Sequence, residues 1–160
     1  LALGINDFRN LVLLDRADES SAFVPDPPAR VWDPQGGPDG SGAPLLTSVQ
    51  TGEQVWRAAI DSQIPPGSRL KIRGLMRVEG MGRLFFRLKP FIFQWQPEPH
   101  VEWLPVVTSV PLRDTGGRWV EFTVPELART PRERDTEVRF ELVLDGPGTG
   151  ALACLNIDLE

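Results

Sequence analysis

Residues 68–95 show the clearest hydrophobic pattern in the chain. Apolar side chains recur at every second position, stop at Gly80, Met81 and Gly82, and then resume the same alternation. Because successive side chains of a strand point to opposite faces, this period places the apolar set on one face. The stretch therefore predicts a long β-hairpin whose apolar face builds the core. The apolar positions are Leu70, Ile72, Met76, Val78, Leu84, Phe86 and Leu88.

The opposite face of this predicted hairpin is strongly basic. It carries seven of the 17 lysine and arginine residues of the chain, namely Arg69, Lys71, Arg73, Arg77, Arg83, Arg87 and Lys89. Two interpretations stay open. In one, neighbouring strands present Glu121, Glu137 and Glu141 and form cross-strand ion pairs. In the other, Arg73, Arg77, Arg83 and Arg87 form a docking face for an acidic partner, because the guanidinium fork binds carboxylates bidentately.

Short strand patterns separated by turns fill the rest of the chain. Strands are expected within 5–15 and at 45–49, 55–60, 101–112, 119–124, 138–144 and 152–159, with one helical turn within 125–135. Pro105 and Pro111 predict that the 101–112 segment lies at a sheet edge or is bulged, and Trp119 is expected to pack in the core. No segment of ten residues has a helical period. Eight or more short strands predict an all-β fold, an antiparallel β-sandwich.

Residues 23–44 interrupt this pattern because they are rich in proline and glycine, which predicts no regular element. Trp32 in the middle favours an arm laid over a surface, since an indole in a free linker has nothing to bury against. The expected organisation is an N-terminal segment and extended arm at 1–44 and a sandwich domain at 45–160. The acidic residues of the arm and its approach suggest that it docks on a basic strand face.

Composition narrows the class of protein. A length of 160 residues fits one domain with an arm, and the net charge of −5 argues against nucleic-acid binding. No apolar run reaches the length of a membrane span, and the N-terminus lacks a signal-peptide pattern, so the protein is expected to be unexported. Leu1 leaves open whether the chain begins at its native start. The single Cys154 lies among apolar residues and is expected to be an inert buried thiol.

Residues with catalytic chemistry are sparse. The lone His100 lies in a proline-rich turn, and no Gly-x-Ser-x-Gly motif is present, so a hydrolytic triad is not expected. Glutamates on strands are interpreted as solvent-facing. Asp33 and Asp39 are interpreted as turn residues rather than calcium ligands. The sequence therefore predicts a non-catalytic protein without a metal site or cofactor.

Four tryptophans, Trp56, Trp95, Trp103 and Trp119, are candidates for a sugar-stacking platform. Trp95 and Trp103 flank the loop at 96–100, so they are expected to lie near each other and to be partly exposed. The alternative, which is favoured, is that these rings pack in the core or at its rim.

Three segments carry a family resemblance. IPPGSRLKIRGLMRV, GRWVEFTV, and EVRFELVLDG followed by GALACLNIDLE resemble the strands of jelly-roll domains of the galactose-binding-like and carbohydrate-binding-module kind. The resemblance covers about residues 54–160 and implies a jelly-roll sandwich. In such domains the strand tryptophan, here Trp119, is usually core. The closing strand often has an acidic pair near a structural calcium, but here Asn156 and Asp158 flank Ile157, so a calcium site is unsupported.

Two functions follow as hypotheses. The first is a structural or accessory protein of a larger assembly that binds neighbouring subunits, including its own copies, through the arm and the basic strand face. A small unexported jelly roll with such an arm resembles accessory head or tail proteins of tailed bacteriophage virions, which would place it in an assembled particle. The alternative is a carbohydrate-binding module that recognises a polysaccharide through exposed tryptophans. The absence of an export signal favours the first.

Overall fold

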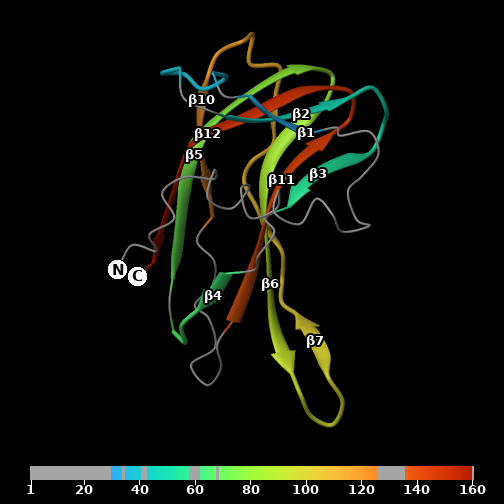
Figure 1. The fold of residues 1–160 in the computed structure, drawn as a ribbon, viewed down its shortest axis with the longest axis vertical. Helices are drawn as coiled ribbons and strands as arrows, with labels where there is room; N and C mark the ends of the chain where they lie inside the picture. The colour runs from blue at the N-terminus through green and yellow to red at the C-terminus, as the bar shows by residue number, and fades with distance from the viewer. Residues whose placement is uncertain are drawn as a thin grey trace.

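The computed structural model describes residues 30–33, 35–40, 43–57, 62–67, 69–125 and 136–159. They form two antiparallel sheets (Figure 1). One sheet has the strand order β1-β2-β12-β5-β10, and the other follows β3-β11-β6-β7 with β4 on β11 and with β8 and β9 on β6. The strands are β1 (Arg30–Asp33), β2 (Ala43–Ser48), β3 (Glu53–Arg57), β4 (Ser62–Ile64), β5 (Leu70–Gly80), β6 (Arg83–Gln94), β7 (His100–Trp103), β8 (Val107–Thr108), β9 (Leu112–Arg113), β10 (Val120–Val124), β11 (Thr136–Asp145) and β12 (Gly148–Leu159).

The core lies between the two sheets and contains the residues that the alternation selected. All seven apolar positions of β5 and β6 are buried, as are Val138, Phe140, Leu142 and Leu144 of β11. Phe86 of β6 lies with its ring centroid 6.1 Å from Phe122 of the facing sheet and 6.1 Å from Phe140 of its own sheet. The predicted all-β antiparallel sandwich is confirmed. The described residues include no helix with the length and hydropathy to span a membrane.

Gly74 interrupts the apolar alternation of β5 because an aromatic ring occupies the space above it. Phe122 of β10 is its register partner. A Cβ atom on Gly74 would lie 2.8 Å from Phe122 Cε1 and 3.2 Å from the carbonyl oxygen of Ala153. The ring of one strand thus fills the space that a side chain on its neighbour would need.

The predicted hairpin of residues 68–95 is wrong. β5 pairs with β12 and β10, whereas β6 pairs with β11, so the two halves belong to different sheets and face each other across the core. At the turn, the amides of Met81 and Gly82 both donate to the carbonyl of Pro147, at 3.0 and 2.7 Å. The alternation identified the buried face correctly, but it carries no information about the pairing partner. One consequence is that the basic residues of β5 and β6 lie on opposite outer surfaces.

The expectation that residues 23–44 hold no regular element is wrong at Arg30–Asp33, which forms β1, and at Ala43 and Pro44, which begin β2 and pair with β1. Arg30–Asp33 lacks proline and glycine, so its backbone can join a sheet edge. Trp32 lies opposite Pro44 in the register. The division of the chain at residue 44 remains an expectation. The predicted elements within 5–15, at 58–60 and within 126–135 lie outside the described residues.

A bulge in β12 reverses the expected burial of Cys154. Ala153 pairs with Leu75 and Asn156 with Arg73, so β12 has one residue more than β5 between these points. Leu152 and Leu155 therefore both point into the core, although they are three residues apart. Cys154 lies at φ 52° and is exposed, which contradicts the predicted buried thiol.

The predicted edge segment at 101–112 is confirmed. It breaks into β7, β8 and β9, which all pair with β6. Between β8 and β9, Ser109 is buried, and its hydroxyl accepts a hydrogen bond from the amide of Phe86 at 2.9 Å. The proline-interrupted chain thus follows the edge of β6 in short pieces.

Candidate functional site

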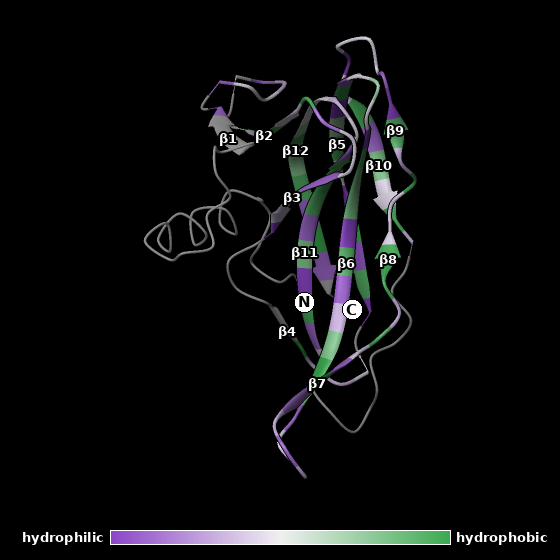
Figure 2. Cartoon of the chain, turned by 90° about the vertical axis from the view of Figure 1, so that its right-hand side faces the viewer, coloured by the Kyte–Doolittle hydropathy of each residue, from purple (hydrophilic) through white to green (hydrophobic). Residues whose placement is uncertain are grey.

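The last part of β6 and the whole of β7 form a hairpin that projects from the sandwich (Figures 1 and 2). In its register Phe91 lies opposite Trp103, and Phe93 lies opposite Val101. Because side chains of a strand alternate between faces, these residues share the face that points away from the core. Trp95 directly follows β6 and contacts Phe93 edge-on, with 4.7 Å between ring centroids. We call these five residues, Phe91, Phe93, Trp95, Val101 and Trp103, the hairpin strip.

Four members of the hairpin strip are exposed to solvent. The exposed fraction is 71% for Trp95, 47% for Trp103, 40% for Phe93 and 38% for Val101. Phe91 is buried and packs against Trp103, with 5.0 Å between ring centroids. Contiguous apolar surface of this kind in a soluble domain marks an interaction site more often than isolated exposed residues do.

Two cations lie beside Trp103. The ammonium of Lys89 is 5.1 Å from the centre of the indole, and the guanidinium carbon of Arg139 is 5.3 Å from it. Arg139 also lies 5.9 Å from the ring of Phe91. Lys89 and Arg139 are directly opposite each other on β6 and β11, two register pairs inward from Phe91. The half-exposed indole is therefore bordered by positive charge on the side nearest the sandwich.

Farther along β6, away from the hairpin, the same outer face carries ion pairs instead of aromatic rings. Arg83 forms an ion pair with Asp145, and Arg87 Nε donates to Glu141 at 2.8 Å while its Nη1 donates to Glu53 at 3.0 Å. Desolvation lowers the pKa of Arg87, but the hydrogen bonds and charges of Glu141 and Glu53 outweigh it and raise the pKa above its ordinary value. The cross-strand pair of Arg87 with Glu141, one of the two open interpretations, is therefore present.

The outer face of the other sheet carries Arg73 and Arg77. Arg77 stacks over Trp119 with its guanidinium carbon 4.9 Å from the ring, and Trp119 is half-buried on this outer face. The expected core position of Trp119 is therefore wrong: Trp119 directly precedes β10, and Phe122 and Val124 are the residues of that strand that are buried.

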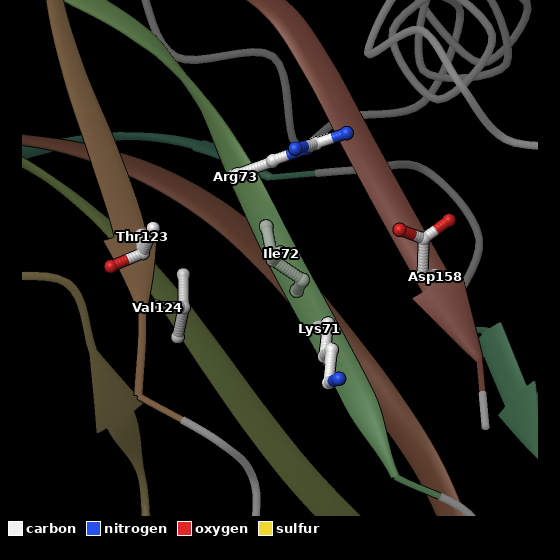
Figure 3. Close-up of a pocket in the computed structure, with 6 residues that line it drawn as sticks. All are labelled: Lys71, Ile72, Arg73, Thr123, Val124 and Asp158. Carbon is white, nitrogen blue, oxygen red and sulfur yellow. The ribbon is translucent and has the colours of Figure 1, made fainter.

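A cleft of about 360 Å³ lies on this sheet (Figure 3). Its lining comes from three adjacent strands, with Lys71 and Arg73 on β5, Thr123 on β10 and Asp158 on β12. Among the described residues, no aromatic side chain lines the cleft. These residues offer charged, hydroxyl and aliphatic groups.

The structure separates the predicted site residues into three groups. Trp95 and Trp103 lie together on the hairpin, Arg83 and Arg87 lie farther along the same outer face and are ion-paired, and Arg73 and Arg77 lie on the opposite sheet. Only the backbone position of Trp32 is described. Trp56 is buried, so it is no longer a candidate for contact with a sugar.

Sequence reasoning missed Phe91, Phe93, Val101 and Arg139 as members of the site. A signal for Phe91 and Phe93 exists. Phe91, Phe93 and Trp95 continue the alternation of Arg87 and Lys89, so the polar face of β6 becomes aromatic. Arg139 is 50 positions from Lys89, and only the pairing of β11 with β6 brings them together.

Groups with reactive or metal-binding chemistry are dispersed. Within the ranges that the structure describes, no three His, Cys, Asp or Glu side chains gather where they could hold a metal ion. His100 is exposed, and its Nδ1 lies 2.7 Å from the carbonyl of Glu98. Asp33 accepts a hydrogen bond from the amide of Gln35 at 3.0 Å, which is a local turn contact.

Comparisons with known proteins show the fold. No protein-family model and no curated sequence matches the chain. The structure of the CBM22-1–GH10 modules of xylanase 10B from Clostridium thermocellum, complexed with xylohexaose, is similar with a TM-score of 0.55 and 10% identity; the match covers 84% of this chain and 25% of that chain. A putative sugar binding protein from Bacteroides thetaiotaomicron matches with a TM-score of 0.50, 7% identity, and 88% and 85% coverage. The enzymatically active domain of bacteriophage CBA120 tailspike protein 4 reaches 0.49 with 12% identity, over 82% of this chain and 18% of that one. At these identities the likeness is one of fold alone.

Proposed function

We propose that this protein is a carbohydrate-binding module that holds a polysaccharide against the hairpin strip. The observation that carries the proposal is the grouping of three exposed rings, Phe93, Trp95 and Trp103, on one face of a projecting hairpin. The apolar C–H face of a sugar ring packs well on an aromatic ring, and such sites need only a few polar groups beside it. Lys89 and Arg139 supply polar groups at that position.

The fold supports this proposal. The chain shares its sandwich with a xylanase module structure that contains xylohexaose and with a protein named for putative sugar binding. The rings that would contact a glycan here come from the hairpin, and the polar groups come from the adjacent parts of β6 and β11. The proposal therefore depends on this local arrangement and uses the fold as background. The protein is proposed to be non-catalytic.

The second candidate is a docking surface for another protein subunit, as in the expected virion accessory role. The observation that favours it is the same exposed apolar strip, because protein interfaces also bury aromatic residues. The docking hypothesis also expected a single basic strand face. The strands that the structure describes form no such face, since Arg73 and Arg77 lie on the opposite sheet from Arg83 and Arg87. This leaves the strip as the shared feature and makes the glycan proposal the stronger one.

Titration with polysaccharides and measurement of the molar mass of the protein in solution distinguish the two candidate functions. Soluble xylan, galactan and glucan are added while tryptophan fluorescence is followed, and light scattering after size exclusion gives the oligomeric state. We expect a fluorescence change with at least one polymer and a loss of about tenfold in affinity for Trp95→Ala and for Trp103→Ala, equivalent to about 1.4 kcal/mol. Trp119→Ala, on the other sheet, is the matched control and should bind normally. No response across a broad glycan array, together with an oligomer that Trp95→Ala dissociates, would refute the proposal in favour of docking.

A further inference from the structure

From the charges around Trp103 we infer that the polysaccharide is acidic, with the carboxylate of a uronate residue bound by Lys89 and Arg139 while its ring stacks on Trp103. This inference rests on the proposed function and adds the chemical class of the ligand. It is carried by the position of two cationic heads within 5.1 and 5.3 Å of one half-exposed indole.

The residues place a stacking ring and two cations within reach of one sugar. Phe91 packs against Trp103, and Lys89 and Arg139 lie opposite each other two register pairs from Phe91. Cations within about 6 Å of an aromatic ring are attracted by its π-face, which restricts where their heads lie. The guanidinium of Arg139 adds a planar fork that fits a carboxylate. A stacked ring therefore presents its carboxylate to cations that are already positioned.

Lys89 differs from the other basic residues on the outer face of β6. Arg83 and Arg87 are each paired with carboxylates, whereas no ion pair among the described residues involves Lys89. Glu137, opposite Phe91, is the acidic residue of β11 on this part of the face. The cleft on the other sheet combines Lys71 and Arg73 with Asp158, and its described lining includes no aromatic ring on which a sugar could stack.

The test compares two ligands with one backbone. Polygalacturonate carries a carboxylate on each residue, and highly methyl-esterified polygalacturonate carries few. By titration calorimetry in about 20 mM salt, where screening is weak, we expect the acid form to bind about fivefold more tightly, the ratio that one exposed ion pair supplies. The preference should disappear in about 1 M salt, where the Debye length falls to about 3 Å.

Variants assign the preference to named residues. Lys89→Gln and Arg139→Gln should each lower the ratio of the two affinities, and Lys89→Arg should keep it. Arg73→Gln, in the cleft on the opposite sheet, is the matched control and should leave the ratio unchanged. Trp103→Ala should weaken both forms, because it removes the stacking surface.

The outcomes distinguish this inference from the proposed function. Equal binding of the two forms, or a preference that Lys89→Gln retains, overturns the acidic specificity while leaving glycan binding intact. Binding of neutral polymers alone has the same meaning. Failure of every polymer, acidic and neutral, overturns both the specificity and the proposed function.

Discussion

The ion pairs of Arg87 predict a large loss of stability when this one cation is removed. Arg87 Nε is 2.8 Å from Glu141 Oε1, and Arg87 Nη1 is 3.0 Å from Glu53 Oε1. The side chains keep 17% of their surface exposed for Arg87, 7% for Glu141 and 42% for Glu53. Arg87→Met would leave the Glu141 carboxylate almost buried without its cation, and breaking such a pair costs about 3–5 kcal/mol. The partial exposure of Arg87 places the expected loss at the lower end of that range.

The same geometry predicts an asymmetry among the variants. Glu53→Gln should cost at most about 1 kcal/mol, because this partner is exposed and its attraction is screened. Arg87→Met combined with Glu141→Leu should recover most of the loss, since it leaves no buried carboxylate without a cation and fills the volume with apolar atoms. Glu53 also loses its partner in this variant, but its side chain is 42% exposed and water screens its charge. Urea denaturation measures each free energy of unfolding. A thermal midpoint should fall by roughly 6–12 °C in Arg87→Met, at about 2–4 °C per kcal/mol. If Arg87→Met costs no more than Glu53→Gln, or if the double variant is as unstable as the single one, the argument from burial is wrong.

Two further predictions concern the other sheet. Gly74→Ala should destabilise the protein by about 1–3 kcal/mol, the usual cost of overpacking, because its Cβ would lie 2.8 Å from Phe122. In urea denaturation, the added change Phe122→Leu should recover part of this loss. An unaltered denaturation midpoint in Gly74→Ala would contradict the packing of Phe122 on Gly74. Cys154 should react with Ellman's reagent in the native protein, at one thiol per chain, because it is exposed on the bulge of β12; a thiol that reacts only in denaturant would show that the strand runs without the bulge.

The buried face of each long strand could be predicted from the sequence, but the pairing of strands could not. Leu70 to Val78 and Leu84 to Leu88 alternate in the same way whether the two strands pair side by side or face each other across a core. The difference lies in the turn, where Met81 and Gly82 donate to Pro147 from a distant part of the chain. Local periodicity contains no information about that contact. The bulge at Cys154 is a similar case, because the apolar run around it is compatible with either phase.

The candidate site was predictable only in its most exposed members. Trp95 and Trp103 could be placed near each other because they flank a short loop. Phe91 and Phe93 continue the phase of Arg87 and Lys89, but Ile92 between them is also apolar, so polarity alone does not show which of these residues face outward. The two arginines paired with carboxylates, Arg83 and Arg87, looked the same in sequence as Lys89. Their partners come from β3 and β11, which only the tertiary structure brings to β6.

The hairpin strip has to serve folding as well as binding, and its members differ in how they divide these roles. A two-stranded hairpin is marginally stable in water by itself, so contacts along its face help to hold it. Trp103 covers Phe91, which is only 5% exposed, and its removal would uncover that ring. Trp95 touches Phe93 but remains mostly in solvent, and it follows the last residue of β6. Loss of affinity in Trp95→Ala with an unchanged unfolding midpoint is therefore the result that assigns binding to the strip independently of folding, whereas Trp103→Ala should affect both.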